Sequence, residues 1–99
     1  MRKIEKEMIK AAATINQQET PTCWKKDNTV VTGKRGFVTI YLHDNHIASF
    51  VDGMLEVNLD TLRRWPSMTT RSRLRALGAD LVSIKGVLHL NGESIYANK

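Results

Sequence analysis

The sequence lacks several features that would define its class at once. It has one cysteine in 99 residues, so it can form neither an internal disulfide nor a zinc site built on thiolates. Polar or charged residues interrupt every apolar stretch, and none approaches the roughly 18 apolar residues that a membrane helix needs. Residues 1–7 carry mixed charge, unlike a secretory signal. We therefore expect a cytoplasmic protein.

Catalytic signatures are missing as well. There is no nucleophile elbow, no glycine-rich phosphate-binding loop and no pair of carboxylates in settings that would separate their pKa values. The glycines fall in expected turns. The sequence therefore predicts no enzyme activity, no catalytic residue, no cofactor and no bound metal.

What is present is the composition of one folded domain. Hydrophobic residues make up 41% and charged residues 25%, which is typical of globular proteins. A chain of 99 residues is too short for two independent cores, so we expect a single domain over residues 1–99. The net charge of +5 favours an anionic partner, such as nucleic acid, an acidic protein or anionic lipid.

Hydrophobic periodicity predicts an α+β fold. Apolar residues recur every three or four positions at the start, which predicts a helix over 1–17 followed by a polar loop. From residue 28 the period changes to two and β-branched residues predominate, which predicts three or four antiparallel strands over 28–58. A turn at Asp44-Asn45 would pair Leu42 with Ile47, and a type I′ turn at Asp52-Gly53 would begin the next hairpin.

The remainder predicts two short helices and a β-rich end. Asp60 can cap a helix that ends at Trp65, before Pro66, and Ser67 or Thr69 can cap a second helix over the rest of 60–78. Turn-forming pairs further along predict β-hairpins over 80–97. Both faces of the 28–58 sheet carry apolar residues, so we expect the sheet to be covered on both sides, or by helices on one side and a partner on the other. A homodimer is compatible with this pattern.

Positive charge is concentrated between residues 61 and 79, which hold five of the fifteen basic residues and no acidic one. The planar guanidinium group donates two parallel hydrogen bonds to phosphate, and a capped helix start adds backbone N–H groups. The segment also resembles a helix-turn-helix with a hairpin wing, with 69–77 as recognition helix. The expected binding residues are Arg63, Arg64, Thr69, Thr70, Arg71, Arg73 and Arg75, with Lys34, Arg35 and Lys85 in turns as further contacts.

Helix geometry qualifies this expectation. At 100° per residue, Arg71 and Arg75 share a face while Arg73 points nearly opposite, and Leu74 with Leu77 form the buried stripe. The alternative is a solvated basic helix that only keeps the protein in solution.

Histidines and aromatics give weaker signals. His43 and His46 flank the predicted turn at 44–45 and would face each other, but a catalytic zinc site needs a third protein ligand, so we interpret them as ordinary polar residues. The string also has a faint similarity to ββα-metal nucleases, although the following helix lacks the histidine that such a site needs. Aromatic residues beside basic ones, such as Trp65, leave stacking on bases open, with core packing expected for most of them.

The segments TLRRWPSMTTRSRLRALG (61–78) and YLHDNHIA (41–48) resemble small accessory proteins of short-tailed lytic bacteriophages. The resemblance extends over about two thirds of the chain. It implies the cytoplasm of an infected bacterium as the setting, and it implies neither an activity nor site residues. By analogy, small phage proteins of this kind bind a host or phage machine, or contact DNA, and seldom catalyse reactions.

Two functions follow from these observations. The leading one is a noncatalytic phage accessory protein that binds nucleic acid, with DNA slightly favoured, through the arginine-rich helical segment. The alternative is an inhibitor or adaptor that binds an acidic host protein during infection. The sequence leaves both open.

Overall fold

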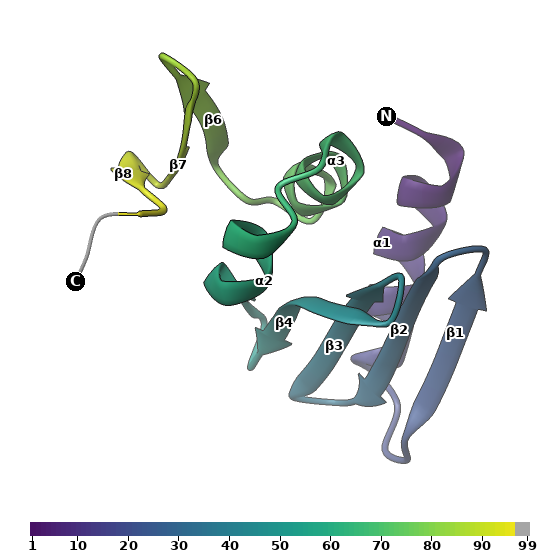
Figure 1. The fold of residues 1–99 in the computed structure, drawn as a ribbon. Helices are drawn as coiled ribbons and strands as arrows, with labels where there is room; N and C mark the ends of the chain where they lie inside the picture. The colour runs from purple at the N-terminus through teal and green to yellow at the C-terminus, as the bar shows by residue number, and fades with distance from the viewer. Residues whose placement is uncertain (97–99) are drawn as a thin grey trace.

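The computed structural model describes residues 1–96, which form two antiparallel sheets connected by two short helices, with a longer helix against the first sheet (Figure 1). The elements in order are α1 (Lys3–Ile15), β1 (Thr22–Lys26), β2 (Thr29–Lys34), β3 (Phe37–Leu42), β4 (Asn45–Val51), β5 (Met54–Val57), α2 (Leu59–Arg64), α3 (Met68–Ala76), β6 (Leu81–Ile84), β7 (Val87–Leu90) and β8 (Glu93–Ser94). This is the predicted α+β class, and the two β regions are separate sheets.

The first sheet is a meander in which β1 to β5 lie in sequence order and each strand is antiparallel to the next. The turn between β4 and β5 is the predicted one: Asp52 and Gly53 both have positive φ, at 50° and 83°, as a type I′ turn requires. It pairs Val51 with Met54, as the sequence predicts.

The edge strand β1 was not predicted, because its segment follows the polar loop and contains no run of β-branched residues. Its side chains alternate between half-buried and exposed, and Trp24 is among the half-buried ones that pack on the core. An edge strand makes ladder hydrogen bonds on one side only, so a mixed sequence with lysines is sufficient there and protects the edge.

The turn between β3 and β4 differs from the prediction. His43 and Asp44 form it, with φ of 51° and 65°, and Leu42 pairs with Asn45 instead of Ile47. Asp, Asn and His adopt this left-handed conformation more readily than most residues, so the local sequence allows either position for the turn. The turn residues alone therefore do not decide where the turn forms, and packing in the folded protein does.

A β-bulge in β4 shifts the register so that apolar residues of β3 and β4 are paired on the buried face. Ile47 is the extra residue, so Val38 pairs with Phe50, whereas a regular hairpin from the predicted turn would pair it with Val51. The bulge allows two successive residues, Ile47 and Ala48, to be buried, with exposed fractions of 2% and 0%. This is the reason that simple alternation did not predict the register.

The core lies on one face of the five-stranded sheet, where α1 and α3 pack side by side. Its largest buried side chains are Met8 and Ile15 from α1, Val31, Val38, Ile40 and Ile47 from the sheet, Leu62 and Leu74 from the short helices, and Leu81 and Ile95 from the C-terminal segment. The opposite face has a row of paired residues, Cys23, Thr32, Thr39, Ser49 and Glu56. Within residues 1–96 no helix covers that polar row, so the helices lie on one face only, and a partner on the other face stays a prediction.

Side-chain caps begin both short helices. Ser67 caps α3 by accepting a hydrogen bond from the Thr70 N–H at 3.1 Å, as predicted. Asn58 caps α2 by accepting from the Thr61 N–H at 3.2 Å, so the predicted cap, Asp60, lies in the first turn instead. The difference arises because α2 begins two residues earlier, directly after β5.

A buried ion pair joins α1 to α3. The Glu5 carboxylate of α1 accepts hydrogen bonds from the Arg73 guanidinium at 2.8 Å and from the Ser72 hydroxyl at 2.6 Å, and Arg73 also lies 3.3 Å from the hydroxyl of Thr29 in β2. Glu5 and Arg73 are 2% and 3% exposed. Burial by itself raises the pKa of Glu5, but the hydrogen bonds from Ser72, Arg73 and the Arg2 N–H and the charge of Arg73 outweigh it and hold the pKa below its usual value.

Replacing Arg73 with methionine is expected to lower the free energy of unfolding by about 3 to 5 kcal/mol, because it leaves a buried carboxylate without its partner. The double variant Glu5→Met/Arg73→Met should recover much of this loss. Urea denaturation measures both values, with Arg71→Met as a control on the exposed side of the same helix. An Arg73→Met variant as stable as the wild type would contradict the structural role.

The ion pair also predicts acid sensitivity. Because the pKa of Glu5 is lower in the folded than in the unfolded protein, its contribution to stability is complete above the unfolded value of about 4.3 and disappears as the pH falls through the folded value. The stability difference between wild type and Glu5→Gln should therefore be largest near neutral pH and shrink below about pH 4. Urea denaturation across that range measures it, and a difference independent of pH would disprove the assignment.

Candidate functional site

Three of the five arginines between residues 61 and 79 are used to hold the fold together. Arg73 forms the ion pair with Glu5. The Nε of Arg63 donates to the carbonyl of Ile95, and its guanidinium lies 3.4 Å from Asp60. The Nε of Arg75 donates to the carbonyl of Leu81 at 2.7 Å. The contacts of Arg63 and Arg75 tie α2 and α3 to the ends of the C-terminal sheet, and that of Arg73 ties α3 to α1.

An outward basic face remains on the same segment. Arg64 and Arg75 are exposed, Arg71 is half-buried, and none of the three forms an ion pair with a carboxylate among residues 1–96. The predicted helix geometry is confirmed, because Leu74 and Leu77 are buried while Arg71 and Arg75 lie on the other side of α3. Arg71 keeps one hydrogen bond of 3.4 Å to the Ser67 carbonyl in the preceding turn.

Two expected contact residues lie inside the protein and must be removed from the candidate surface. Arg73 is 3% exposed and Thr70 is 4% exposed, so neither can reach a partner without local unfolding. Thr69 is half-buried and lines a hollow between α2, α3 and the β3–β4 turn. Arg73 does not belong to the outward surface because α3 presents opposite sides to the core and to solvent.

The turn residues Lys34 and Arg35 are not brought to this face. Their turn is held at the C-terminal end of α1, where the Gly36 N–H donates to Asn16 at 3.0 Å, whereas α3 is tied to Glu5 near the start of α1. The two anchors, Glu5 and Asn16, are eleven positions apart along the helix, which is about 16 Å. Arg35 is in addition paired with Glu19 at 2.6 Å.

Lys85 is placed differently, since it begins the tight turn between β6 and β7 and the next residue, Gly86, lines a cleft with Arg71. The cleft has a volume of about 200 Å³ and is lined by Pro66, Arg71, Ser83, Gly86, Leu88 and Tyr96. It lies between the α2–α3 connection and the C-terminal sheet. Sequence reasoning missed Ser83 and Tyr96, because no local pattern indicates that they fold back toward α3.

Exposed apolar side chains lie in and after the α2–α3 connection and on the face of the β6–β7 hairpin that points away from the cleft. Trp65 and Met68, in and after the α2–α3 connection, are 50% and 74% exposed. On the β6–β7 hairpin, Val82, Ile84 and Val87 are 45%, 48% and 37% exposed. Since Val82 pairs with His89 and Ile84 with Val87, these three lie on the hairpin face opposite to Leu81 and Leu88. The segment is therefore amphipathic as well as basic.

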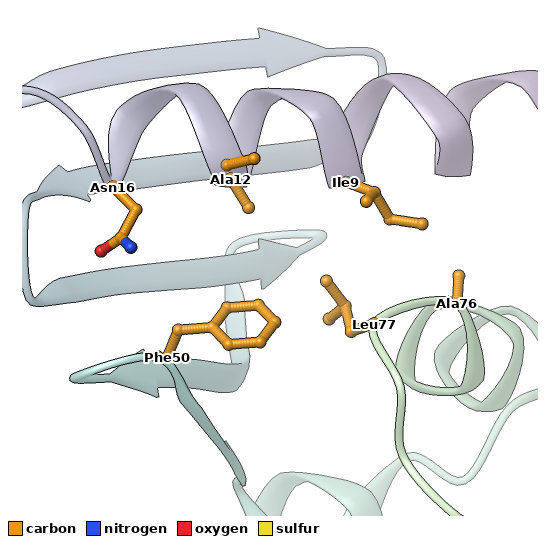
Figure 2. A pocket seen from close by; sticks show the side chains of 8 residues that line it. Ile9, Ala12, Asn16, Phe50, Ala76 and Leu77 are labelled. Atoms are coloured by element: carbon orange, nitrogen blue, oxygen red, sulfur yellow. The ribbon is translucent and has the colours of Figure 1, made fainter.

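A second hollow, of about 230 Å³, lies between α1, β4 and α3 (Figure 2). Ile9, Ala12, Phe50 and Leu77 give it apolar walls, and Asn16 at one end is already bonded through its Oδ1 to the Gly36 N–H. No acid, base or nucleophile lines it. The hollow offers apolar contacts to a bound group, and its lining residues include none that catalyses a reaction.

A serine, a histidine and an asparagine form a hydrogen-bonded chain at the end of the sheet. His46 Nε2 lies 2.8 Å from the Ser49 hydroxyl, and His46 Nδ1 lies 3.2 Å from Asn58 Nδ2. The same Asn58 accepts the Thr61 N–H through its Oδ1, as the cap of α2. The distance between His46 Nε2 and the Ser49 hydroxyl is the one found between a catalytic nucleophile and its general base.

The cap decides the direction of these hydrogen bonds. Because Asn58 Oδ1 is held by the Thr61 N–H, its Nδ2 must be the donor to His46 Nδ1, and neutral His46 then carries its proton on Nε2. That nitrogen donates to Ser49 and cannot accept its proton, so the chain lacks the arrangement that activates a serine. Ser49 is also only 5% exposed. The network is a structural link between β4 and α2.

The two histidines do not face each other as expected. His43 lies in the turn, exposed, with Nε2 3.3 Å from Asn28, whereas His46 lies on β4 in the network above. The shifted turn separates them. Across the part of the chain that the structure describes, no three His, Cys, Asp or Glu residues are grouped so that they could hold a metal ion.

A comparison with protein-family models matches residues 1–99 to the family described as Kyanoviridae Gp96 protein. The chain belongs to this family of phage proteins. Membership in the Kyanoviridae Gp96 family supports a phage accessory protein, but not the short-tailed lytic phages in particular. No curated protein and no solved structure matches the chain.

The Kyanoviridae Gp96 match assigns no residue a role, so the candidate site depends on its own geometry. Among the described residues of this family member, no helix has the length and apolar character to cross a membrane. The feature that stands out chemically is the outward basic face of α2 and α3 beside the cleft at Tyr96.

Proposed function

We propose that this phage protein is a noncatalytic nucleic-acid-binding protein that acts in the cytoplasm of the infected bacterium. The binding surface consists of Arg64, Arg71, Arg75 and Lys85 and is called here the arginine surface. The observation that carries the proposal is the outward side of α3, where Arg71 and Arg75 have no carboxylate partner although Arg73 on the opposite side has one. Unpaired guanidinium groups attract phosphate through charge and bidentate hydrogen bonds.

The way α3 is packed indicates which part of the nucleic acid it would contact. The helix lies against α1, β4 and β6, so only one row of side chains is presented outward. A recognition helix that enters the major groove must present several side chains to base edges. A single basic row suits phosphate contacts, which fix position and give little sequence specificity. DNA is favoured slightly over RNA.

The proposal predicts salt-dependent binding to a generic 20-base-pair duplex. Affinity should fall steeply between 50 and 200 mM salt, and Arg64→Ala/Arg71→Ala, which leaves the structural bond of Arg75 to Leu81 in place, should reduce the slope of log affinity against log salt by about 2, one for each lost phosphate contact. Fluorescence anisotropy measures both quantities.

The matched control is Lys10→Ala/Lys25→Ala, which removes the same charge from exposed lysines beside the hollow between α1 and β1. It should keep the wild-type slope to within the small change that a lower net charge causes. Absence of binding at 50 mM salt would end the proposal, and so would equal losses in the two double variants.

A second function, an inhibitor or adaptor of a bacterial host protein, is favoured by the exposed Trp65 and Met68 beside the arginine surface. The centres of protein interfaces are enriched in Trp, Met, Tyr and Arg, and a few such residues carry most of the binding energy. The same arginines would then meet an acidic protein surface.

A pull-down from nuclease-treated host lysate tests this alternative. We expect one host protein to be retained in stoichiometric amount, and to be lost with both Trp65→Ala and Arg64→Ala/Arg71→Ala, because an interface at this surface needs the apolar and the charged contacts together. Lys10→Ala/Lys25→Ala should retain it. If nothing is captured, or if capture is indifferent to Trp65, the adaptor function is wrong.

A further inference from the structure

The cleft beside the arginine surface combines an exposed aromatic ring with a guanidinium group. Tyr96 is 58% exposed, and it lines the same cleft as Arg71 and Pro66. Tyr96 follows Ile95, which is 2% exposed and is held by the Arg63 side chain and by a hydrogen bond of 3.0 Å to the Leu88 carbonyl. The backbone is thus fixed directly before Tyr96, the residue that lines the cleft.

The size and the walls of the cleft limit what it can hold. Pockets for drug-sized ligands begin near roughly 300 Å³, so about 200 Å³ suits a single ring system. The α2–α3 side of the cleft carries Pro66 and Arg71, and the hairpin side carries the cross-strand partners Ser83 and Leu88, with no carboxylate among the lining residues. A flat, uncharged ring with polar edges and an anion attached nearby fits this combination.

We propose that this cleft takes one unpaired base of a single-stranded nucleic acid, stacked on Tyr96, while Arg71 contacts the adjacent phosphate. This inference rests on the proposed function and deepens it. A base inside a duplex is covered by its neighbours and cannot enter the cleft without being unpaired, so the cleft selects a single strand or an unpaired end. Lys85 and Arg64 extend the phosphate contacts on either side of the bound base.

The test compares a dT12 oligonucleotide with a 12-base-pair duplex at 50 mM salt by fluorescence anisotropy. Tyr96→Leu, which keeps an apolar side chain and removes the ring face, should weaken dT12 binding by at least about fivefold and leave duplex binding unchanged. Tyr96→Phe keeps the ring and should bind dT12 as the wild type does. Phe37→Leu is the matched control, because it removes another exposed aromatic ring, 53% exposed, from the open face of the sheet.

A second measurement does not depend on substitution. A single 2-aminopurine in the oligonucleotide should lose fluorescence on binding to the wild type, because stacking on a ring quenches it, and should lose less on binding to Tyr96→Leu. Thermal denaturation of each variant ensures that all are folded under the conditions of the assay.

The outcomes separate the two proposals. If neither the oligonucleotide nor the duplex binds, the proposed function fails, and the inference with it. If both bind and Tyr96→Leu binds dT12 as tightly as the wild type does, the inference alone is overturned and the arginine surface remains. If an acidic peptide containing tryptophan binds through Tyr96 while dT12 does not, the cleft is a protein-binding site and the inference is wrong.

Discussion

The ion pair between Glu5 and Arg73 sets the orientation of the helix on which the proposed function depends. It connects residues that are 68 positions apart in the chain, and both side chains are almost completely buried. A helix can rotate about its axis unless something fixes it, and a guanidinium bound to an inward carboxylate does so. Since successive residues are 100° apart, placing Arg73 inward places Arg71 and Arg75 outward. The interior contact thereby determines which arginines remain for a partner.

Arginine has two roles in this protein, and the number of arginines overstates the basic surface. Arg63, Arg73 and Arg75 each donate to an acceptor inside the protein, and only Arg75 of these three is also exposed. The long side chain and several donors of arginine allow one residue to tie two elements together while it covers apolar surface. Clustered basic residues in a sequence can therefore form hydrogen bonds inside the protein as well as a binding face.

Local signals predicted the parts of the fold that depend on neighbouring residues. The periodicity of α1, the β-branched residues that predict strands at β2 to β5 and the turn at Asp52-Gly53 are all local, and the structure confirms these elements. The edge strand β1 and the turn at His43 depend on packing against distant elements, and these were missed or misplaced. For the candidate site, helix geometry predicted that Arg73 points away from Arg71. Nothing local indicated that Glu5 would receive it, or that Tyr96 would lie beside Arg71.

The way in which the C-terminal sheet is attached has an evolutionary consequence. Arg63 and Arg75 hold it through the backbone carbonyls of Ile95 and Leu81, and a carbonyl is present whatever amino acid occupies the position. Apart from the few buried side chains, residues of this sheet can therefore be exchanged while it stays in place. The protein thus has a part whose exposed face can diversify between relatives at little cost to the stability of the rest.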